Sequence, residues 1–582
     1  MPEQQSTFKE TIISSLPAEV QPYVGELFSA NGMLILGCCL FLIINRNKNP
    51  KGKLASGRWA NNKEIAAARK LACEQMSNPK DEKFALYIGT PRKSQIITEP
   101  DGRKILCLPE DPRTIYFPNA QENILYIGRS GSGKTFSTGN PLTMSAIQQG
   151  FTVFYYDFKG HENPAPSSKL VDFAIEHGSK VSIIDPNSRE SGCLNPVTFL
   201  ENGIDSETAL EIAATINGNL KLSGGGGNSG FFSETGNQLV QAVMMLARSS
   251  PYPDIAMCHA ILSLENLVER LKAAKLPYYQ KVAFDTFLSS AGSPETAASI
   301  ATTASIMFTR FMTPKILRTF AGKNTIPLDV DGRHLIIFRM NPHQRKVVAP
   351  LLAVALQLMV NRNIYRPKFD FPRKAPLVVS LDEINSIYVE PLVDWLNQNR
   401  SSKFSALLGV QSLGFLEKVY SKEEVDGILG GCTTQIIFQL NDKKTAEYFS
   451  AILGEKEVEI SQKTRNTGQG KTSYSYSKQK HIRPLLELSQ LTKIKRGKAI
   501  IINSGQENDE ESRIPYQKKV IIPGRDRRAM KKGGRNWAKH RLEMIANQQN
   551  AVELTDLDFK QRKIAADLLL PEPGKKQCAV AL

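Results

Sequence analysis

The segment Gly128–Thr135 constrains the fold of this chain more than any other part of it. It matches the phosphate-loop pattern G-x-x-x-x-G-K-[ST] and directly follows a short apolar run, Ile124–Ile127. A strand, a glycine-rich loop and a helix in this order place backbone N–H groups and the positive end of a helix dipole around a phosphate. The predicted nucleotide-binding residues are Gly128, Arg129, Ser130, Gly131, Ser132, Gly133, Lys134 and Thr135.

Two side chains of this loop have predicted roles in the chemistry. We expect Lys134 to reach the β- and γ-phosphates of ATP and the Thr135 hydroxyl to hold Mg²⁺. An ordinary flexible turn is the alternative interpretation, but the strand-like run before the loop disfavours it. The pattern therefore predicts an ATP and Mg²⁺ site.

A second chemical signal lies at the end of the apolar run Leu377–Leu381, which is followed by two acids. Asp382 is predicted to hold the Mg²⁺ shell, and Glu383 to polarise the water that attacks the γ-phosphate. Gln411 ends the strand predicted over Phe404–Gln411, where a γ-phosphate sensor is expected; a polar residue that merely opens a loop is the alternative. These residues predict hydrolysis as well as binding.

Strand-like runs separated by helix-length segments predict an α/β fold with a parallel sheet and helices on both faces. Residues 121–201 and 324–523 are predicted to form this nucleotide-binding domain, with its last strands over 434–440, 499–503 and 520–523. Between its two parts, residues 202–323 carry helical patterns and predict an inserted all-α domain. The helices expected there span 207–216, 233–248, 262–274, 277–290 and 296–311.

The N-terminal region predicts one membrane anchor. Leu27–Ile44 is almost uncharged and is followed at once by basic residues, whereas Lys9 is the only basic residue before it. The positive-inside rule then places residues 1–26 outside, the anchor over 27–45 and the rest of the chain in the cytoplasm. A buried helix of a soluble core is the alternative. We expect residues 46–120 to form a juxtamembrane segment with a helix near 62–76.

The balance of charge favours a polyanionic partner or an anionic membrane surface. Lys and Arg number 74 against 57 Asp and Glu, which gives a net charge of +17. Residues 461–480 are polar and cationic and predict a solvated loop. The C-terminal tail, residues 524–582, begins with eight basic residues against one acid between Arg525 and Arg541. A solvated basic tail and a nucleic-acid or partner contact are both open there, with a short helix expected over 554–570.

The cysteines predict no disulfide framework. Eight are scattered along the chain, and neither a C-x-x-C nor an H-E-x-x-H pattern occurs. A reducing compartment without a zinc site is the expectation.

The order of these parts resembles one family, the coupling proteins of type IV secretion and conjugation, known as TraG/TraD-type membrane ATPases. The similar segments run in sequence from about residue 50 to 505. They are Ser56–Ala60, Asp157–Glu162, Ile184–Pro186 with Leu194–Pro196, Leu381–Ile384, Gly409–Tyr420, Cys432, Leu440–Asp442, Thr445–Phe449 and Leu453–Gly454.

The resemblance implies a RecA-like motor domain, an inserted helical domain that faces the cytoplasm, and a homo-hexameric ring at the bacterial inner membrane. It also implies recruitment of single-stranded DNA or a relaxase–DNA complex to the channel components of a type IV secretion system. Members of the family commonly have two membrane helices, whereas one is recognised here. Arg400 directly precedes the Phe404–Gln411 strand, where the family places an arginine finger that completes the neighbouring subunit's site.

Two other functions stay open at this point. An FtsK/HerA-type DNA pump shares the motor fold, but it is expected to bring several membrane helices or a DNA-reading module. A receptor that binds ATP in order to dock substrates, and hydrolyses it slowly, would carry the same motifs.

Overall fold

The computed structural model describes residues 55, 57–77, 82–92, 95–98, 104–107, 110–222, 234–290, 292–365, 373–468, 471–547 and 553–574. The chain divides into two compact units. One contains the residues up to Arg58 together with Leu453–Leu485, and the other contains Trp59–Ile452 and Leu486–Leu582. The predicted anchor over 27–45 and the tail over 1–26 lie outside the described residues.

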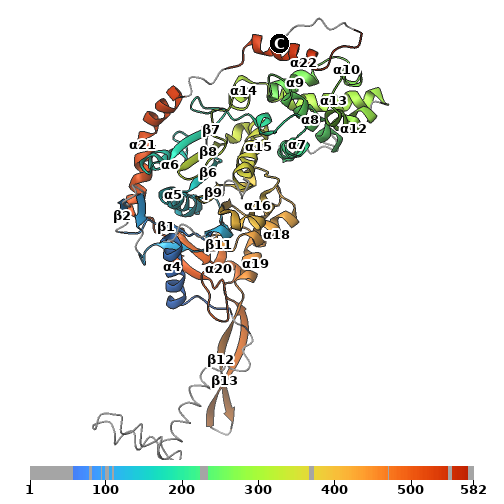
Figure 1. Ribbon diagram of the computed structural model, residues 1–582. Helices are drawn as coiled ribbons and strands as arrows, with labels where there is room; N and C mark the ends of the chain where they lie inside the picture. Colours follow the sequence, from blue (N-terminus) through green and yellow to red (C-terminus); the bar gives the residue numbers. More distant parts are fainter. Residues whose placement is uncertain are drawn as a thin grey trace, which may run out of the picture. The chain divides into compact units, whose positions relative to one another are not determined.

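A nine-stranded sheet forms the centre of the larger unit (Figure 1). Along the sheet, the strands are β15 (Tyr516–Lys519), β14 (Lys498–Ile502), β11 (Thr434–Ile437), β5 (Ile124–Ile127), β10 (Phe404–Val410), β9 (Leu377–Leu381), β6 (Thr152–Asp157), β8 (His334–Arg339) and β7 (Lys180–Ile184). From β11 to β7 all neighbours are parallel, whereas β14 runs antiparallel to both β11 and β15. The α/β class is confirmed. The predicted parallel sheet extends from β11 to β7, and the antiparallel strands β14 and β15 continue it at one edge.

Helices cover both faces of this sheet because its strands are apolar on both sides. The helices α5 (Asn140–Gln148) and α6 (Ser168–Glu176) lie to one side of the strands and α15 (Arg345–Ile364) to the other (Figure 1). Residues of β5, β6, α5 and α6 share one hydrophobic core. The carboxyl ends of the parallel strands therefore meet at one exposed edge between two helical layers.

The helix α15 is long and apolar enough to cross a membrane, together with the short turn that precedes it. Its most apolar window is 83% buried inside the structure, which is the behaviour of a core helix. Among the described residues, this is the one helix that meets the criteria of length and composition.

The segment between β7 and β8 is helical, as the sequence predicted. Its helices are α7 (Ser206–Leu222), α8 (Glu234–Arg248), α9 (Ile255–Leu262), α10 (Leu267–Ala273), α11 (Tyr278–Ala283), α12 (Asp285–Ser290), α13 (Pro294–Thr309) and α14 (Pro314–Phe320). The sequence did not resolve α9 and α14, and it joined α11 to α12. These helices belong to the larger unit and do not form a compact unit of their own.

The region before the phosphate loop contains more structure than the predicted helix. The helix α4 (Asn62–Ser77) lies where it was expected, but β1 (Leu86–Ile88) pairs with β4 (Ile115–Phe117) and β2 (Gln95–Thr98) with β3 (Lys104–Cys107). Buried side chains of β1 and β4 join the core of the main sheet. This block packs on α5 and so supports the helix that follows the phosphate loop.

Two predictions for the C-terminal third are wrong. Residues 461–468 and 471–480 lie in a long antiparallel hairpin, β12 (Glu455–Gly468) and β13 (Lys471–Pro484), and not in a loop. The last strand is Tyr516–Lys519 and not 520–523. Residues 524–547, for which a solvated tail and a nucleic-acid or partner contact were both open, form one helix, α21 (Gly524–Asn547), that packs on α6. The helix expected over 554–570 is confirmed as α22 (Asp556–Leu569).

Candidate functional site

The phosphate loop lies at the carboxyl edge of the sheet, between β5 and the helix that leads into α5. Gly128 N donates to Val410 O on β10 at 3.2 Å, and Arg129 N donates to Gln439 O after β11 at 2.9 Å. The strands on both sides of β5 therefore fix the entrance of the loop. Beyond Lys134 the chain makes one π-helical turn, Thr135–Gly139, before Pro141 in the first turn of α5 removes a backbone donor.

Glycine is required at two kinds of position in this loop. Gly131 and Gly133 have φ angles of +77° and +92°, which L residues rarely adopt. A Cβ at Gly128 would lie 2.7 Å from the Cβ of Phe438. The backbone can thus turn its N–H groups inward, which a phosphate cradle needs.

The structure joins the loop to the acids at the end of β9. Lys134 Nζ donates to Glu383 Oε1 at 2.7 Å, and Thr135 Oγ1 donates to Asp382 Oδ1 at 2.9 Å. Lys134, Asp382 and Glu383 are all buried. Two pairs of neighbouring residues, separated by about 250 positions in the sequence, therefore form one polar cluster with direct contacts.

Electrostatics in this cluster are unbalanced. Burial, followed by the neighbouring charge of Glu383, raises the pKa of Asp382 from 3.8 to about 7. Glu383 has a left-handed backbone with φ of +58°. Among the described residues, neither its buried Oε2 nor the buried Ser132 Oγ has a hydrogen-bond partner. Such buried polar groups cost stability unless a ligand satisfies them.

The residues of the cluster suit ATP with Mg²⁺. A hydroxyl and a carboxylate in direct contact offer oxygen ligands of the kind that Mg²⁺ prefers. The lysine ammonium, the inward-facing loop and the unsatisfied Ser132 hydroxyl offer donors for phosphate oxygens.

The two remaining predicted residues lie at opposite ends of β10. Gln411 directly follows Val410, whose carbonyl accepts from the phosphate loop, so Gln411 is beside the cluster and half-buried. Arg400 opens a short 3-10 turn before β10 and is exposed. It lies at the amino edge of the sheet, away from the phosphate loop of its own chain.

Gln439 is a site residue that the sequence reasoning missed. Its side-chain oxygen accepts from Arg129 Nε at 2.9 Å, and its amide donates to Thr492 O at 2.9 Å. It therefore holds the exposed arginine of the phosphate loop against the edge of the sheet. Its position directly before the Leu440–Asp442 segment was the signal that could have indicated it.

A second buried cluster lies at the same edge of the sheet, at the end of β8. Arg339 donates to Ser167, Ser168 and Glu190, and its guanidinium carbon lies 4.7 Å from the ring centroid of Trp537 on α21. Arg541 of the same helix donates to Glu190 Oε2 at 3.0 Å. A cavity of about 240 Å³ adjoins this cluster, and Trp537 and Arg541 contribute to its wall.

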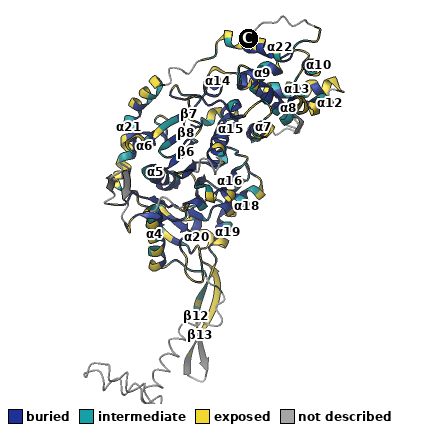
Figure 2. Cartoon of the chain, viewed as in Figure 1, coloured by how far each residue is buried: buried dark blue, intermediate teal, exposed yellow. Residues whose placement is uncertain are grey.

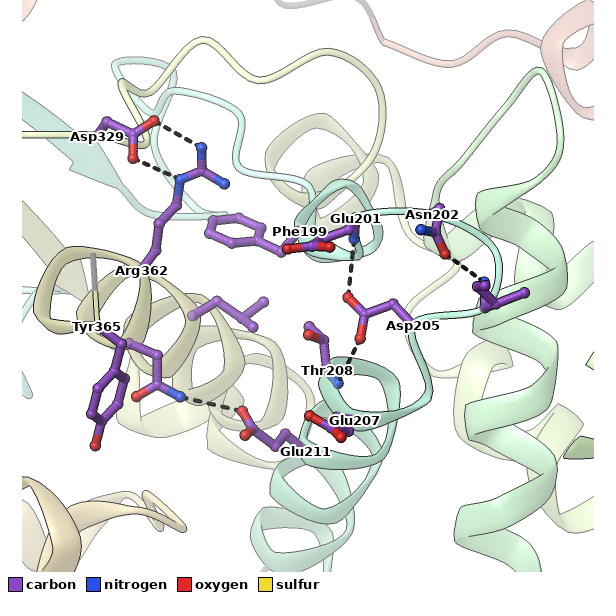
Figure 3. Close-up of a pocket in the computed structure, with 13 residues that line it drawn as sticks. Phe199, Glu201, Asn202, Asp205, Glu207, Thr208, Glu211, Asp329, Arg362 and Tyr365 are labelled. Carbon is purple, nitrogen blue, oxygen red and sulfur yellow. Dashed lines mark hydrogen bonds and ion pairs between the residues drawn. The ribbon is translucent and has the colours of Figure 1, made fainter. Parts of the chain in front are cut away.

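Figure 3 shows a larger pocket, of about 720 Å³, between α7 and α15. Its wall carries five acids and one arginine, Arg362, which pairs with Asp329 at 2.8 Å. Among the described residues, none that line this pocket belongs to the phosphate loop or to the acids that follow β9. The pocket is therefore separate from the candidate nucleotide site.

Comparisons with known proteins agree with this architecture. Residues 376–496 match a family profile described as the TraM recognition site of TraD and TraG. The conjugal transfer protein TraG of Rhizobium radiobacter is 23% identical over 359 residues, which cover 58% of this chain and 55% of that protein. The chain thus spans about half the length of this curated relative.

Solved structures of the plasmid coupling protein TrwB have a similar fold. The complex with ADP and Mg²⁺ has a TM-score of 0.51 at 17% identity, with 69% of this chain and 86% of that chain covered. The complex with a non-hydrolysable ATP analogue has a TM-score of 0.51 at 14% identity, with 82% and 96% covered. This chain therefore shares the overall fold of TrwB. The profile match and the curated relative support the conjugative coupling protein family that the sequence motifs indicated, and the fold agrees with it.

Proposed function

We propose that this chain is an ATP-hydrolysing coupling protein of a conjugative or type IV secretion system. The observation that carries this proposal is the contact of Lys134 with Glu383 and of Thr135 with Asp382. These contacts bring the phosphate loop and the acids after β9 to one place at the carboxyl edge of a RecA-like sheet. TrwB has been solved with ADP and Mg²⁺ and with an ATP analogue, which favours the same ligands here.

The geometry supports a defined change when a nucleotide binds. Lys134 cannot pair with Glu383 and neutralise a γ-phosphate at the same time without sharing its charge. The phosphate would therefore draw Lys134 away, and Glu383 would be free to orient a water for in-line attack. Thr135 and Asp382 would hold Mg²⁺, which when bound neutralises charge on the phosphates. Gln411, at the end of β10, would sense the γ-phosphate.

In the proposed ring of identical subunits, Arg400 of a neighbouring subunit completes each nucleotide site. Arg400 lies at the opposite end of β10 from Gln411, which supports a role at a neighbouring subunit's nucleotide and not at its own. A planar guanidinium suits this role because it can contact two γ-phosphate oxygens as charge develops. We extend the proposal to a homo-hexamer at the inner membrane, with the anchor over 27–45 and the domain boundaries given above. Its substrate is single-stranded DNA or a relaxase–DNA complex, which it hands to the secretion channel.

Rate measurements on the purified full chain test this function. Hydrolysis of Mg-ATP is expected, and single-stranded DNA is expected to stimulate it. The Arg400→Ala protein should bind nucleotide normally but lose turnover by about 10³-fold or more. Arg310→Ala, which removes an exposed arginine from the helical insertion, is the matched control. Mixed rings of Arg400→Ala and Lys134→Ala subunits should regain activity, because some interfaces then carry an intact loop and an intact arginine. Full activity of Arg400→Ala alone would refute the role of Arg400.

A further inference from the structure

The hairpin β12–β13 is long for a two-stranded ribbon. Each strand has 14 residues in continuous register, from Glu455↔Pro484 to Gly468↔Lys471. Most of its described side chains are exposed (Figure 2), among them Tyr474 at 52% and Tyr476 at 67%. A two-stranded ribbon that buries so little apolar surface is only marginally stable by itself, so burial does not explain its length.

The register divides the side chains of this hairpin into two different faces, because cross-strand partners point to the same side. One face carries the pairs Glu459↔Lys480, Ser461↔Lys478 and Lys463↔Tyr476, and Tyr474 follows on the same side of β13. The opposite face carries Lys456↔Arg483 and Val458↔His481 near the base, followed by Ile460↔Gln479 and Gln462↔Ser477. Among the described side chains, basic and aromatic residues thus share the outer part of one face, while the other face is uncharged beyond its base.

Charge on the first face changes along the hairpin. Near its base, Glu457 pairs with Lys480 at 3.2 Å and Glu459 with Lys478 at 3.5 Å. Beyond Glu459 the sequence has no acid before Glu487. The part of this face beyond Glu459 therefore carries the cation Lys463 and no acid, whereas Lys478 and Lys480 pair with the two acids near the base.

Lysine and tyrosine side chains on this face are close to one another. Lys463 Nζ lies 4.0 Å from the ring centroid of Tyr474 and 5.7 Å from that of Tyr476. The two rings alternate with one residue between them, so both stand on the same side of β13. An ammonium group between two exposed rings offers stacking surfaces for bases and a positive charge for the phosphate that connects them.

We propose that this face, defined by Lys463, Tyr474, Tyr476 and Lys478, is a binding site for single-stranded nucleic acid. It deepens the proposed function, on which it rests, by naming a surface that contacts the transferred strand. Bases stack on Tyr474 and Tyr476, and Lys463 and Lys478 neutralise phosphates. Recognition is independent of sequence, because a tyrosine ring accepts any base and the lysines read only charge.

An anionic membrane is the other polyanion that a basic face could meet, and the composition of the hairpin disfavours it. Binding at a lipid interface requires apolar side chains that enter the acyl boundary. Between Ile460 and Ile482 the hairpin has no aliphatic residue, only hydroxyl, amide, glycine, basic and tyrosine positions. These groups suit a hydrated phosphate backbone with stacked bases.

Fluorescence anisotropy of the purified full chain with a labelled oligothymidine of about 20 nucleotides tests the site, since this length exceeds the about 4–16 nucleotides that one single-strand-binding OB fold covers. Tyr474→Ala and Tyr476→Ala should each weaken binding at least about fivefold, and Tyr→Phe at the same positions should leave it nearly unchanged. Lys463→Ala should lower the slope of log Kd against log salt by about 0.7.

Matched controls separate this face from its surroundings. Ser477→Ala and Gln479→Ala change the opposite face of the same strand, and both positions are exposed. Lys495→Ala removes the same charge as Lys463→Ala from an exposed position outside the hairpin. None of the three should change binding. Thermal unfolding and DNA-free ATP hydrolysis should be those of the parent in all hairpin variants, which shows that the fold is intact.

The outcomes are distinguishable. If the parent binds the oligonucleotide and the tyrosine variants bind equally well, the hairpin proposal is wrong while the proposed function stands. If the parent binds no nucleic acid but hydrolyses ATP, the DNA part of the proposed function fails as well. Competition with phosphatidylserine vesicles, compared with phosphatidylcholine vesicles, tests the membrane. Vesicle binding that depends on Tyr474 and Tyr476, with oligonucleotide binding unchanged in their variants, would overturn the proposal.

Discussion

Two buried ionic clusters lie at the same edge of the central sheet, and they differ in how completely they are satisfied. At the end of β8, Arg339 and Glu190 have partners from three segments, including Trp537 and Arg541 of α21. At the end of β9, one buried oxygen of Glu383 has no hydrogen-bond partner in the part of the chain that the structure describes. Ionic groups that only stabilise the fold can have all their hydrogen bonds made within the protein. A ligand-binding site cannot, because some of its groups must be left to contact the ligand.

The backbone shows the same difference. Glu383 has a left-handed φ and is followed by a short 3-10 turn, a conformation that costs energy for a residue other than glycine. Arg339 is the last residue of a regular strand, in register with Asp157 on β6. The cluster around Glu383 therefore contains unfavourable interactions that the cluster around Arg339 does not contain.

The largest expected effect comes from Lys134→Ala. This change removes the cation that stabilises the transferred phosphate, so ATP hydrolysis should fall to background. It also leaves Asp382 and Glu383 buried together without their lysine, so the nucleotide-free protein should unfold at lower temperature. Rates with Mg-ATP and melting curves measure the two effects, with Lys444→Ala, which breaks an exposed pair with Glu417, as the control. Hydrolysis at the parental rate would refute the assignment of the phosphate loop.

Breaking the other cluster should affect stability and not chemistry. Arg339→Ala leaves Glu190 buried beside a single remaining cation, Arg541, and should lower the free energy of unfolding by about 3–5 kcal/mol. Arg362→Ala breaks a largely exposed pair with Asp329 and should cost less than about 1 kcal/mol. Urea unfolding measures both. At a temperature where the Arg339→Ala protein is folded, it should bind nucleotide like the parent; a selective loss of nucleotide affinity would contradict the comparison.

The pH dependence of the free energy of unfolding should identify the buried carboxyl group of Asp382. In the folded protein without nucleotide or Mg²⁺, the pKa of Asp382 is raised to about 7 from 3.8, mainly by burial. Between these values the folded state binds a proton that the unfolded state has lost. The stability from Asp382 is therefore present below about pH 4 and is lost as the pH rises to about 7, by at most about 4 kcal/mol. Asp382→Asn should remove this slope in unfolding curves, and an unchanged slope would show that another group titrates.

A smaller effect is expected where α21 packs on α6. A Cβ at Gly533 would lie 2.2 Å from the carbonyl oxygen of Lys169, whereas a Cβ at Gly534 would meet Lys169 Cγ at 3.7 Å, an ordinary contact. Gly533→Ala should therefore cost about 1–3 kcal/mol, and Gly534→Ala should be close to neutral or stabilising. Differential scanning calorimetry of the pair measures the difference. Equal melting temperatures would show that α21 does not depend on this close approach.

The nucleotide cluster was largely predictable from the sequence because each half of it is contiguous. Gly128–Thr135 is a local pattern whose backbone requirements select its residues, and Asp382 and Glu383 end a strand that is apolar at four of its five positions. Their contact follows from the parallel topology, since strand ends of this kind meet at one edge. The sequence did not predict the pairing of Lys134 with Glu383, because Lys134 can pair either with this acid or with a phosphate.

The helix α21 and the hairpin β12–β13 were missed because neither buries a conventional apolar stripe. The buried positions of α21 repeat at helical spacing, but they are Asp526, Met530, Gly533, Trp537 and His540, so hydropathy does not detect them. The hairpin alternates basic and aromatic residues with neutral polar ones, which removes the contrast between apolar and polar positions that identifies most strands. The shift of the last strand to Tyr516–Lys519 has a similar origin, since its residues are mostly polar.

The last sixty residues also affect the order in which the protein can reach its final structure. The helix α21 packs on α6 of the sheet domain through Lys532 and Glu176, and α22 packs on α9 of the helical insertion, with Arg562 against Asp254 and Arg270 against Asp567. On the ribosome, all of these partners are synthesised before either helix emerges. Acidic groups such as Glu190 and Asp254 therefore lack the cations Arg541 and Arg562 until α21 and α22 have been synthesised. A product truncated before α21 would lack both cations and should therefore unfold more easily.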